Sequence, residues 1–242
     1  MFASLDPRLL RRDCGWHNHS TGEDVTVIDL HTHSFLSDGV LVPSELVRRA
    51  RVAGYRAMAI TDHADESNIE DVLKQLTRVA RQLNSDKAFR LLPGVELTHI
   101  PPAHIPLMVK KARALGAIVV VGHGETLAEP VEEGTNAAYI KAGVDILAHP
   151  GLVTAEDARA AAKKPVHFEI TSRGGHSLSN GHVAAAAKTH GVKMVLNTDT
   201  HSPGDLISDE KALNVALGAG LNEEDFRRMQ ENAKAFVKKV RP

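Results

Sequence analysis

Histidine and carboxylate side chains follow one apolar segment after another along this chain. The first are His31 and His33, which end such a segment two residues apart, so that both imidazoles point to the same side of an extended strand. Nitrogen and oxygen ligands that converge on one place can hold divalent ions and activate water. The candidate metal ligands are His31, His33, Asp38, His63, Glu96, His123, His149, Asp199 and His201.

The candidate ligands offer only nitrogen and oxygen atoms. Cys14 is the only cysteine, which excludes an internal disulfide, a thiolate-rich zinc site and an iron–sulfur cluster. The set therefore favours zinc, manganese or iron over copper(I). A single histidine is often only a hydrogen-bonded side chain, and His17 and His19, which follow no apolar segment, are interpreted as surface residues. Nine candidates at successive segment ends indicate a metal centre.

Length and composition limit the classes of protein. The 242 residues suit one domain, and 43% hydrophobic residues are enough for a core. The formal charge of -1 and the 4% aromatic content argue against binding of long nucleic acid but leave a small phosphorylated substrate open. The chain has no apolar run of membrane-spanning length and no signal-peptide core. We expect no membrane partner, and the lone cysteine favours a cytoplasmic setting.

Strand and helix patterns alternate along the chain after an irregular lead-in over residues 1–24. The expected strands are 25–30, 57–60, 89–97, 117–121, 144–148, 166–170 and 193–196. The expected helices are 43–53, 69–83, 105–115, 135–142, 154–163, 181–190, 209–217 and 223–240. This alternation predicts a parallel sheet with right-handed crossovers. In a parallel β/α barrel all the carboxyl ends of the strands meet on one face, which would gather the candidate ligands.

Other polar residues near the predicted strand ends are candidates for substrate binding. Arg173 follows a strand that carries no metal ligand, and its guanidinium suits a phosphate, although a surface salt bridge is the alternative. Ser172 and His176 would assist it. Asp62 is expected to orient a metal-binding imidazole without binding an ion itself. Glu169 is expected either to do the same or to face a polar group of the substrate. His99 is a candidate for the pocket mouth, and the acidic loop over residues 122–134 is a candidate lid or rim.

Six short motifs, taken in order, resemble those of the PHP (polymerase and histidinol phosphatase) superfamily, and the resemblance covers roughly residues 25–205. The motifs are Asp29-Leu30-His31-Thr32-His33, Ser37-Asp38-Gly39, Thr61-Asp62-His63, Gly94-Val95-Glu96, His149-Pro150 and Asp199-Thr200-His201. The resemblance implies a single-domain α/β fold over residues 25–242, a distorted (β/α)7 TIM-like barrel with C-terminal helices, which agrees with the strand count.

The resemblance also implies three divalent ions (zinc, manganese or iron). They would be held by His31, His33, Glu96 and Asp199, by Glu96, His123 and His149, and by Asp38, His63 and His201. The implied reaction is hydrolysis of a phosphomonoester by a metal-activated hydroxide, held by Glu96 and the other ligands. The family's first motif sometimes has a histidine at the position of Asp38, and the carboxylate here favours manganese.

Several functions fit these residues. The leading expectation is a phosphatase for a small phosphomonoester, with histidinol phosphate as one candidate. A nucleotide or oligonucleotide phosphoesterase is the nearest alternative. An amidohydrolase-like hydrolase also begins with a His-x-His pair on a barrel, but the Glu96 bridge and a third metal site favour phosphate chemistry. A non-catalytic metal-binding barrel is the remaining alternative.

Overall fold

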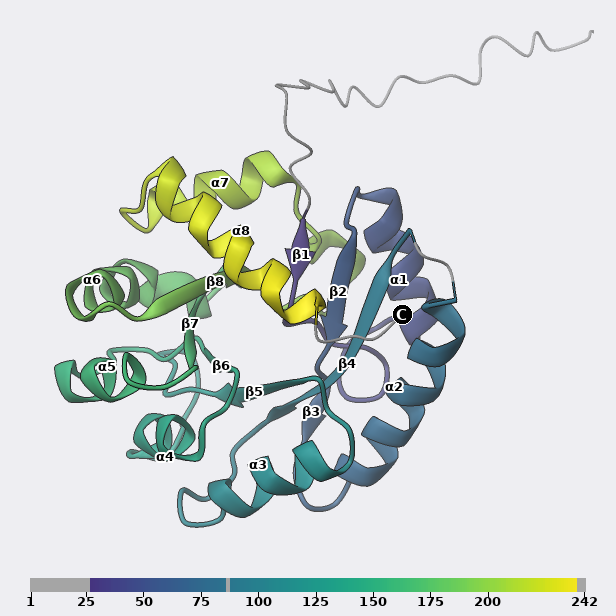
Figure 1. Cartoon of the computed structure of the whole chain (residues 1–242), viewed down its shortest axis with the longest axis horizontal. Coiled ribbons are helices and arrows are strands. Elements are labelled where there is room, and N and C mark those ends of the chain that lie inside the picture. Colours follow the sequence, from purple (N-terminus) through teal and green to yellow (C-terminus); the bar gives the residue numbers. More distant parts are fainter. Residues whose placement is uncertain (1–26, 86–87, 239–242) are drawn as a thin grey trace, which may run out of the picture.

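The strands form a parallel barrel, as a computed structural model describing residues 27–85 and 88–238 shows (Figure 1). Its barrel strands run in the order β1-β2-β4-β5-β6-β7-β8, and every pairing between neighbours is parallel. Their bounds are β1 Ile28–Asp29, β2 Ala57–Ile60, β4 Arg90–Leu97, β5 Val119–His123, β6 Ile146–Ala148, β7 His167–Thr171 and β8 Lys193–Asn197. The predicted seven-stranded, distorted β/α barrel is confirmed.

A short extra strand, β3 (His63–Ala64), was not predicted. It pairs with β4 just beyond β2, and the two segments are separated by Thr61 and Asp62. The backbone N–H of Glu96 donates to the carbonyls of both separating residues, at 3.0 and 3.1 Å. After this local break, the strand pairing resumes with His63 directly opposite Glu96. Two candidate ligands thereby become neighbours.

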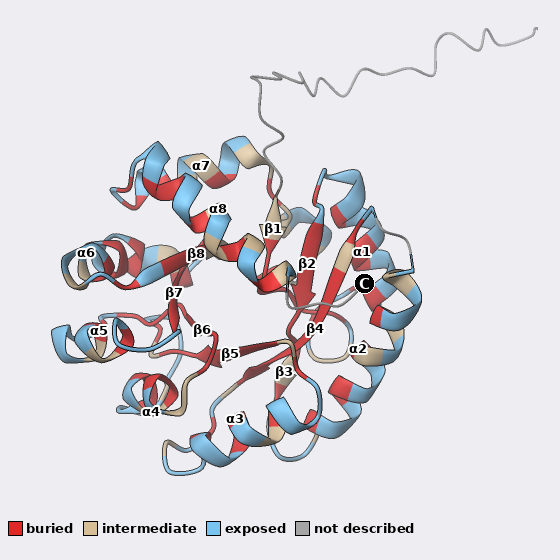
Figure 2. Ribbon diagram, viewed as in Figure 1, coloured by how far each residue is buried: buried red, intermediate tan, exposed pale blue. Residues whose placement is uncertain are grey.

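Helices surround the barrel with their apolar faces inward. Figure 2 shows buried strands and helices whose outer faces are exposed. The bounds are α1 Pro43–Val52, α2 Ile69–Leu83, α3 Ile105–Ala114, α4 Thr135–Ala142, α5 Ala155–Ala161, α6 Asn180–His190, α7 Asp209–Gly218 and α8 Glu223–Val237. Each predicted helix is present, and Thr154 caps the start of α5 because its Oγ1 accepts the Asp157 N–H.

The expectations for the lead-in and for membrane-spanning helices have different outcomes. The irregular lead-in at residues 1–24, with His17 and His19, lies outside the described residues. Within the described ranges, every helix is too short or too polar to cross a membrane.

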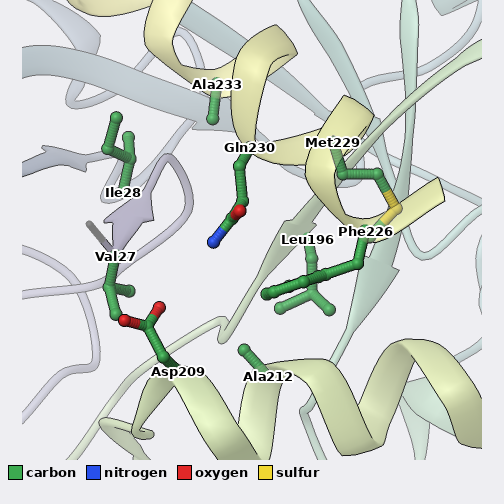
Figure 3. Close-up of a pocket in the computed structure, with 9 residues that line it drawn as sticks. All are labelled: Val27, Ile28, Leu196, Asp209, Ala212, Phe226, Met229, Gln230 and Ala233. Carbon is green, nitrogen blue, oxygen red and sulfur yellow. The ribbon is translucent and has the colours of Figure 1, made fainter. Parts of the chain in front are cut away.

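The barrel has one incompletely sealed seam, between β1 and β8. There the strands are linked by a single bridge between Thr32 and Thr200 and by the Leu30 N–H, which donates to Asn197 Oδ1 at 2.9 Å. Helices α7 and α8 cover the outside of this seam and leave a small, mostly apolar cavity (Figure 3). The carboxylate of Asp209 and the amide of Gln230 are among the side chains that line it.

Apolar side chains fill the barrel interior below the polar strand ends. Inward-facing residues such as Leu92, Val121 and Val195 pack there with Ala233 and Phe236 of α8. The Phe236 ring lies 5.2 Å from the ring of His167, the first residue of β7. Helix α8 therefore closes the amino-terminal end of the barrel and leaves the carboxyl end for chemistry.

We expect Phe236→Ala to lower the free energy of unfolding by about 3–5 kcal/mol, because the substitution removes a buried ring and leaves a cavity. The Phe236 side chain is buried, whereas Leu217 is an exposed apolar residue of α7. Urea denaturation of Phe236→Ala and Leu217→Ala measures the difference. Equal stability of the two variants would contradict the role given to α8.

Candidate metal centre

All nine candidate ligands lie together at the carboxyl end of the barrel. Glu96 Oε2 lies 3.3 Å from His31 Nε2, and Asp199 Oδ1 lies 3.2 Å from His33 Nε2. The remaining members join through short contacts of the same kind or through adjacent imidazole rings. These are Asp38 with His63 and His201, Glu96 with His149, and His149 with His123.

The spacing of these atoms fits bound cations. Two ligands at 2.0–2.1 Å from one tetrahedral ion are separated by about 3.3 Å. The cluster has this separation at His31–Glu96, His33–Asp199 and His149–Glu96, with 3.3, 3.2 and 3.4 Å. Both Glu96 oxygens, His31 Nε2, His33 Nε2 and Asp199 Oδ1 are buried and have no hydrogen-bond partner among the described residues. Since unpaired buried polar atoms are costly, a divalent ion is the partner that this donor set fits.

Several groups of donors have the compactness that a shared ion requires, with their ligand atoms within 4.8 Å of one another, and three of them correspond to the expected ligand sets. They are His33, Asp38, His63 and His201; His31, His33 and Glu96; and Glu96, His123 and His149. These groups closely follow the three ligand sets expected from the sequence motifs. Glu96 belongs to two of them, because its two oxygens face different imidazoles.

Glu169 orients His31 through the ring nitrogen that faces away from Glu96. Its Oε1 is hydrogen-bonded to His31 Nδ1 at 2.8 Å and accepts the Asn197 side-chain amide at 2.8 Å, while its Oε2 accepts the His149 N–H. Burial raises the pKa of Glu169, but His31 lowers it more strongly in combination with the other partners, so the net pKa is lowered. An anionic Glu169 turns Nε2 of His31 toward Glu96, as a supporting carboxylate does behind a metal-bound histidine.

Asp62 supports the loop after β1 rather than an imidazole. Its carboxylate accepts the Ser34 N–H, the Ser34 hydroxyl and the Ser37 hydroxyl, at 2.7, 2.7 and 2.8 Å. Gly39 closes the same loop, where a Cβ atom would overlap the backbone of His33. This tight turn carries Asp38 back over the cluster, where its Oδ2 lies 3.2 Å from His201 Nε2.

Backbone strain coincides with the cluster. His149, Asp199 and His99 have φ values of 30°, 52° and 50°, in the left-handed region that L residues rarely adopt. Each such residue costs on the order of 1–3 kcal/mol and is kept where the surrounding structure requires it. Here the strained turns direct two candidate ligands inward at strand ends.

The substrate-binding candidates divide between two places. Arg173 Nη1 lies 3.3 Å from Asp205 Oδ2, so the salt bridge considered from the sequence is present. The same arginine lines a polar cavity of about 330 Å³ together with Ser172 and Lys211. Asp205 also accepts the His201 N–H at 3.0 Å, which places this cavity beside the metal cluster.

His176 lies in the cluster itself. Its ring stacks on that of His149 with centroids 4.2 Å apart, and its Nδ1 is hydrogen-bonded to Thr126 Oγ1 at 2.6 Å. Glu129 is also present, with Oε2 at 3.1 Å from His123 Nε2. The sequence did not single out Glu129, because nothing in the pattern distinguishes it from Glu125, Glu132 or Glu133 on the same loop.

The chain is a parallel β/α barrel whose imidazoles and carboxylates gather at the carboxyl end, where the active sites of such barrels lie, in groups that could hold divalent ions. The chain belongs to the PHP domain family, whose model matches residues 29–164. It is 53% identical over 201 residues to an uncharacterized protein of Methanocaldococcus jannaschii, a match that covers 82% of this chain and 92% of that protein.

Two solved structures share the fold at low sequence identity. One is the histidinol phosphate phosphatase of Lactococcus lactis complexed with zinc, L-histidinol and phosphate, with a TM-score of 0.55, 16% identity and coverage of 88% of this chain and 92% of that one. The other is a chain of an archaeal ribonuclease P with mature tRNA, with a TM-score of 0.63, 16% identity and coverage of 87% and 90%.

We expect Glu169→Gln to weaken zinc binding by about 10- to 100-fold, because the neutral amide no longer holds His31 in its binding orientation. Competition with a chromophoric chelator measures the affinity. Glu156→Gln, a change of an exposed glutamate on α5, is the matched control. Unchanged affinity in Glu169→Gln would show that zinc binding by His31 does not depend on the negative charge of Glu169.

Proposed function

We propose that the protein is a metal-dependent phosphoesterase that hydrolyses a small phosphomonoester, as a histidinol phosphatase does. The observation that carries this proposal is the set of buried, unpartnered nitrogen and oxygen atoms at ligand-to-ligand distances on the carboxyl face of a PHP-family barrel. The proposed ligands are His31, His33, Asp38, His63, Glu96, His123, His149, Asp199 and His201. Zinc, manganese and iron suit these donors.

When bound, the divalent ions would supply two effects, a lower pKa of water and neutralisation of the charge on phosphoryl oxygens. The chain's own residues set the geometry for both. Glu96 and Asp199 present oxygens toward several imidazoles at once, and Glu96, which belongs to two of the ligand sets, is the proposed bridging carboxylate. Glu169 keeps His31 oriented from behind, and the strained turns at His149 and Asp199 hold their side chains inward.

Neighbouring residues are proposed to position the substrate. Arg173 and Ser172 line the polar cavity beside the cluster, where a guanidinium can bind a phosphate or carboxylate oxygen pair. Burial lowers the pKa of His176 to about 4, aided by His149 and opposed by Asp199, so its ring is neutral near pH 7. The Thr126 hydroxyl holds Nδ1 of that ring, which turns Nε2 toward the cluster.

The fold relative from L. lactis supports a small substrate, because that protein is complexed with zinc, a histidinol and phosphate. A small leaving group also suits the chain's nearly balanced formal charge of -1.

A nucleotide or oligonucleotide phosphoesterase is the second candidate, favoured by an exposed aromatic residue at the site. Phe35 is 67% exposed and lies on the loop that carries Asp38. Leu127, Leu152 and Leu178 are also exposed, on the loops that follow β5, β6 and β7. A nucleobase can stack on such an aromatic side chain, and the fold likeness to a ribonuclease P chain gives independent support.

Phosphate release from a panel of phosphomonoesters, including histidinol phosphate and mononucleotides, tests the proposal in added manganese or zinc. Asp199→Ala should lower turnover by more than about 100-fold, because a group that organises charge at the reacting phosphate is lost. Asp71→Ala, at an exposed position of α2, is the control, and thermal melting checks that both variants fold. Near-normal turnover in Asp199→Ala would remove it from the site, and no release from any substrate would reject the phosphomonoesterase proposal.

Phe35→Ala separates the two candidate functions. If nucleotides are the substrates, loss of base stacking, on the order of 1–3 kcal/mol, should raise the KM for mononucleotides by about 10-fold. Hydrolysis of a phosphomonoester without an aromatic ring, such as glycerol phosphate, should be unaffected, since it has no group that can stack on Phe35. The exposed valine of α1 provides the control, Val52→Ala. An unchanged KM for every nucleotide would count against the second candidate.

A further inference from the structure

The loop between β5 and α4 extends the cluster beyond the nine expected ligands. Glu129 on this loop reaches three imidazoles that come from different parts of the chain. Its Oε2 lies 3.1 Å from His123 Nε2 and 3.4 Å from His99 Nε2, and its Oε1 lies 3.5 Å from His176 Nε2. Among the described residues, these imidazoles are its only ion-pair partners, and none of them is a lysine or arginine.

These distances repeat those found between the expected ligands. Ligands of one tetrahedral ion are about 3.3 Å apart, and the contacts of Glu129 with His123 and His99 lie on either side of that value. Ligand atoms of His99, His123 and Glu129 all lie within 4.8 Å of one another, which is compact enough to share an ion.

Neighbouring contacts hold the partners of Glu129 in place. Thr126, three residues earlier on the same loop, is hydrogen-bonded to His176 Nδ1 and so turns Nε2 of that ring toward Glu129. The His123 side chain is almost fully buried at the end of β5. Glu129 itself is 38% exposed, so it approaches the cluster from the open mouth of the barrel.

Other acids of the loop have different surroundings. Glu125 Oε1 accepts the N–H of Asn136 at 2.8 Å, in the first turn of α4. Glu132 is exposed. Glu129 alone of these three carries its carboxylate to the imidazoles.

We propose that Glu129 is a tenth ligand of the metal centre and binds, through Oε2, the divalent ion that His123 holds. This assignment rests on the proposed metal centre. His123 also belongs to the group of Glu96 and His149, so Glu129 is assigned to the ion of that group rather than to a separate site. The ion consequently ties the loop over residues 124–134 to the barrel mouth.

Zinc titration against a chromophoric chelator tests the assignment on the whole chain. Glu129→Gln should bind one ion about 10- to 100-fold more weakly than wild type, at least the loss seen when a supporting residue is removed. The other ions should bind normally. Glu132→Gln, at an exposed position of the same loop, should match wild type.

The titration distinguishes failure of the Glu129 assignment from failure of the whole metal centre. Identical binding by wild type and Glu129→Gln would overturn the assignment of Glu129 and leave the nine-ligand centre standing. A wild-type protein that binds no zinc or manganese would overturn both the centre and the tenth ligand. Weaker binding of every ion in Glu129→Gln would contradict a role confined to the ion of His123.

Hydrogen exchange provides a readout independent of affinity. Saturating zinc should slow amide exchange in residues 124–134 of wild type, because the ion links Glu129 to His123, and should slow it less in Glu129→Gln. Equal protection of this loop in both proteins would overturn the link between the loop and the ion.

Discussion

The rest of the structure depends on a carboxylate buried at the centre of the barrel mouth. Glu96 has no exposed surface, and a buried charge is costly unless opposite charges or hydrogen bonds compensate it. Burial raises the pKa of Glu96, but His31, His123 and His63 lower it more, so the group is anionic. The surrounding imidazoles alone leave both its oxygens without a hydrogen-bond partner among the described residues. Divalent cations at the proposed metal centre would resolve this conflict by giving these oxygens a partner.

The barrel supplies the conditions for that arrangement. Continuous apolar strands fill the interior up to the level of Glu96, and α8 closes the opposite end with Phe236. The break between β2 and β3 then sets His63 opposite Glu96. Polar atoms therefore concentrate on one face, where strained turns and the supporting carboxylate of Glu169 orient them.

Much of this arrangement could be predicted from the sequence. Apolar runs followed by histidine or carboxylate residues located the barrel strands and brought His31, Glu96 and Asp199 to one face, because parallel strands share a carboxyl end. The predicted helices agree with the structure since their apolar spacing and terminal glycines are local signals, as at Gly143 after α4.

Features that depend on loops could not be predicted. Glu129 reaches the cluster through the path of a long connection, and such paths have no periodic pattern. His176 was expected to assist Arg173, but its ring stacks on that of His149. Asp62 was expected near an imidazole, but the turn that it stabilises forms only when Ser34 and Ser37 fold back over it. The two-residue strand β3 depends on pairing with a distant strand, and its own sequence is too short to indicate it.

Crystallography of the protein grown with zinc and phosphate, with anomalous data recorded at the zinc edge, tests the central claim most directly. The account predicts zinc peaks about 2.0–2.2 Å from nitrogen and carboxylate oxygen atoms of the nine ligands, with Glu96 between two of them and a phosphate oxygen on the exposed side. Zinc peaks elsewhere, or none at the carboxyl end of the barrel, would contradict it.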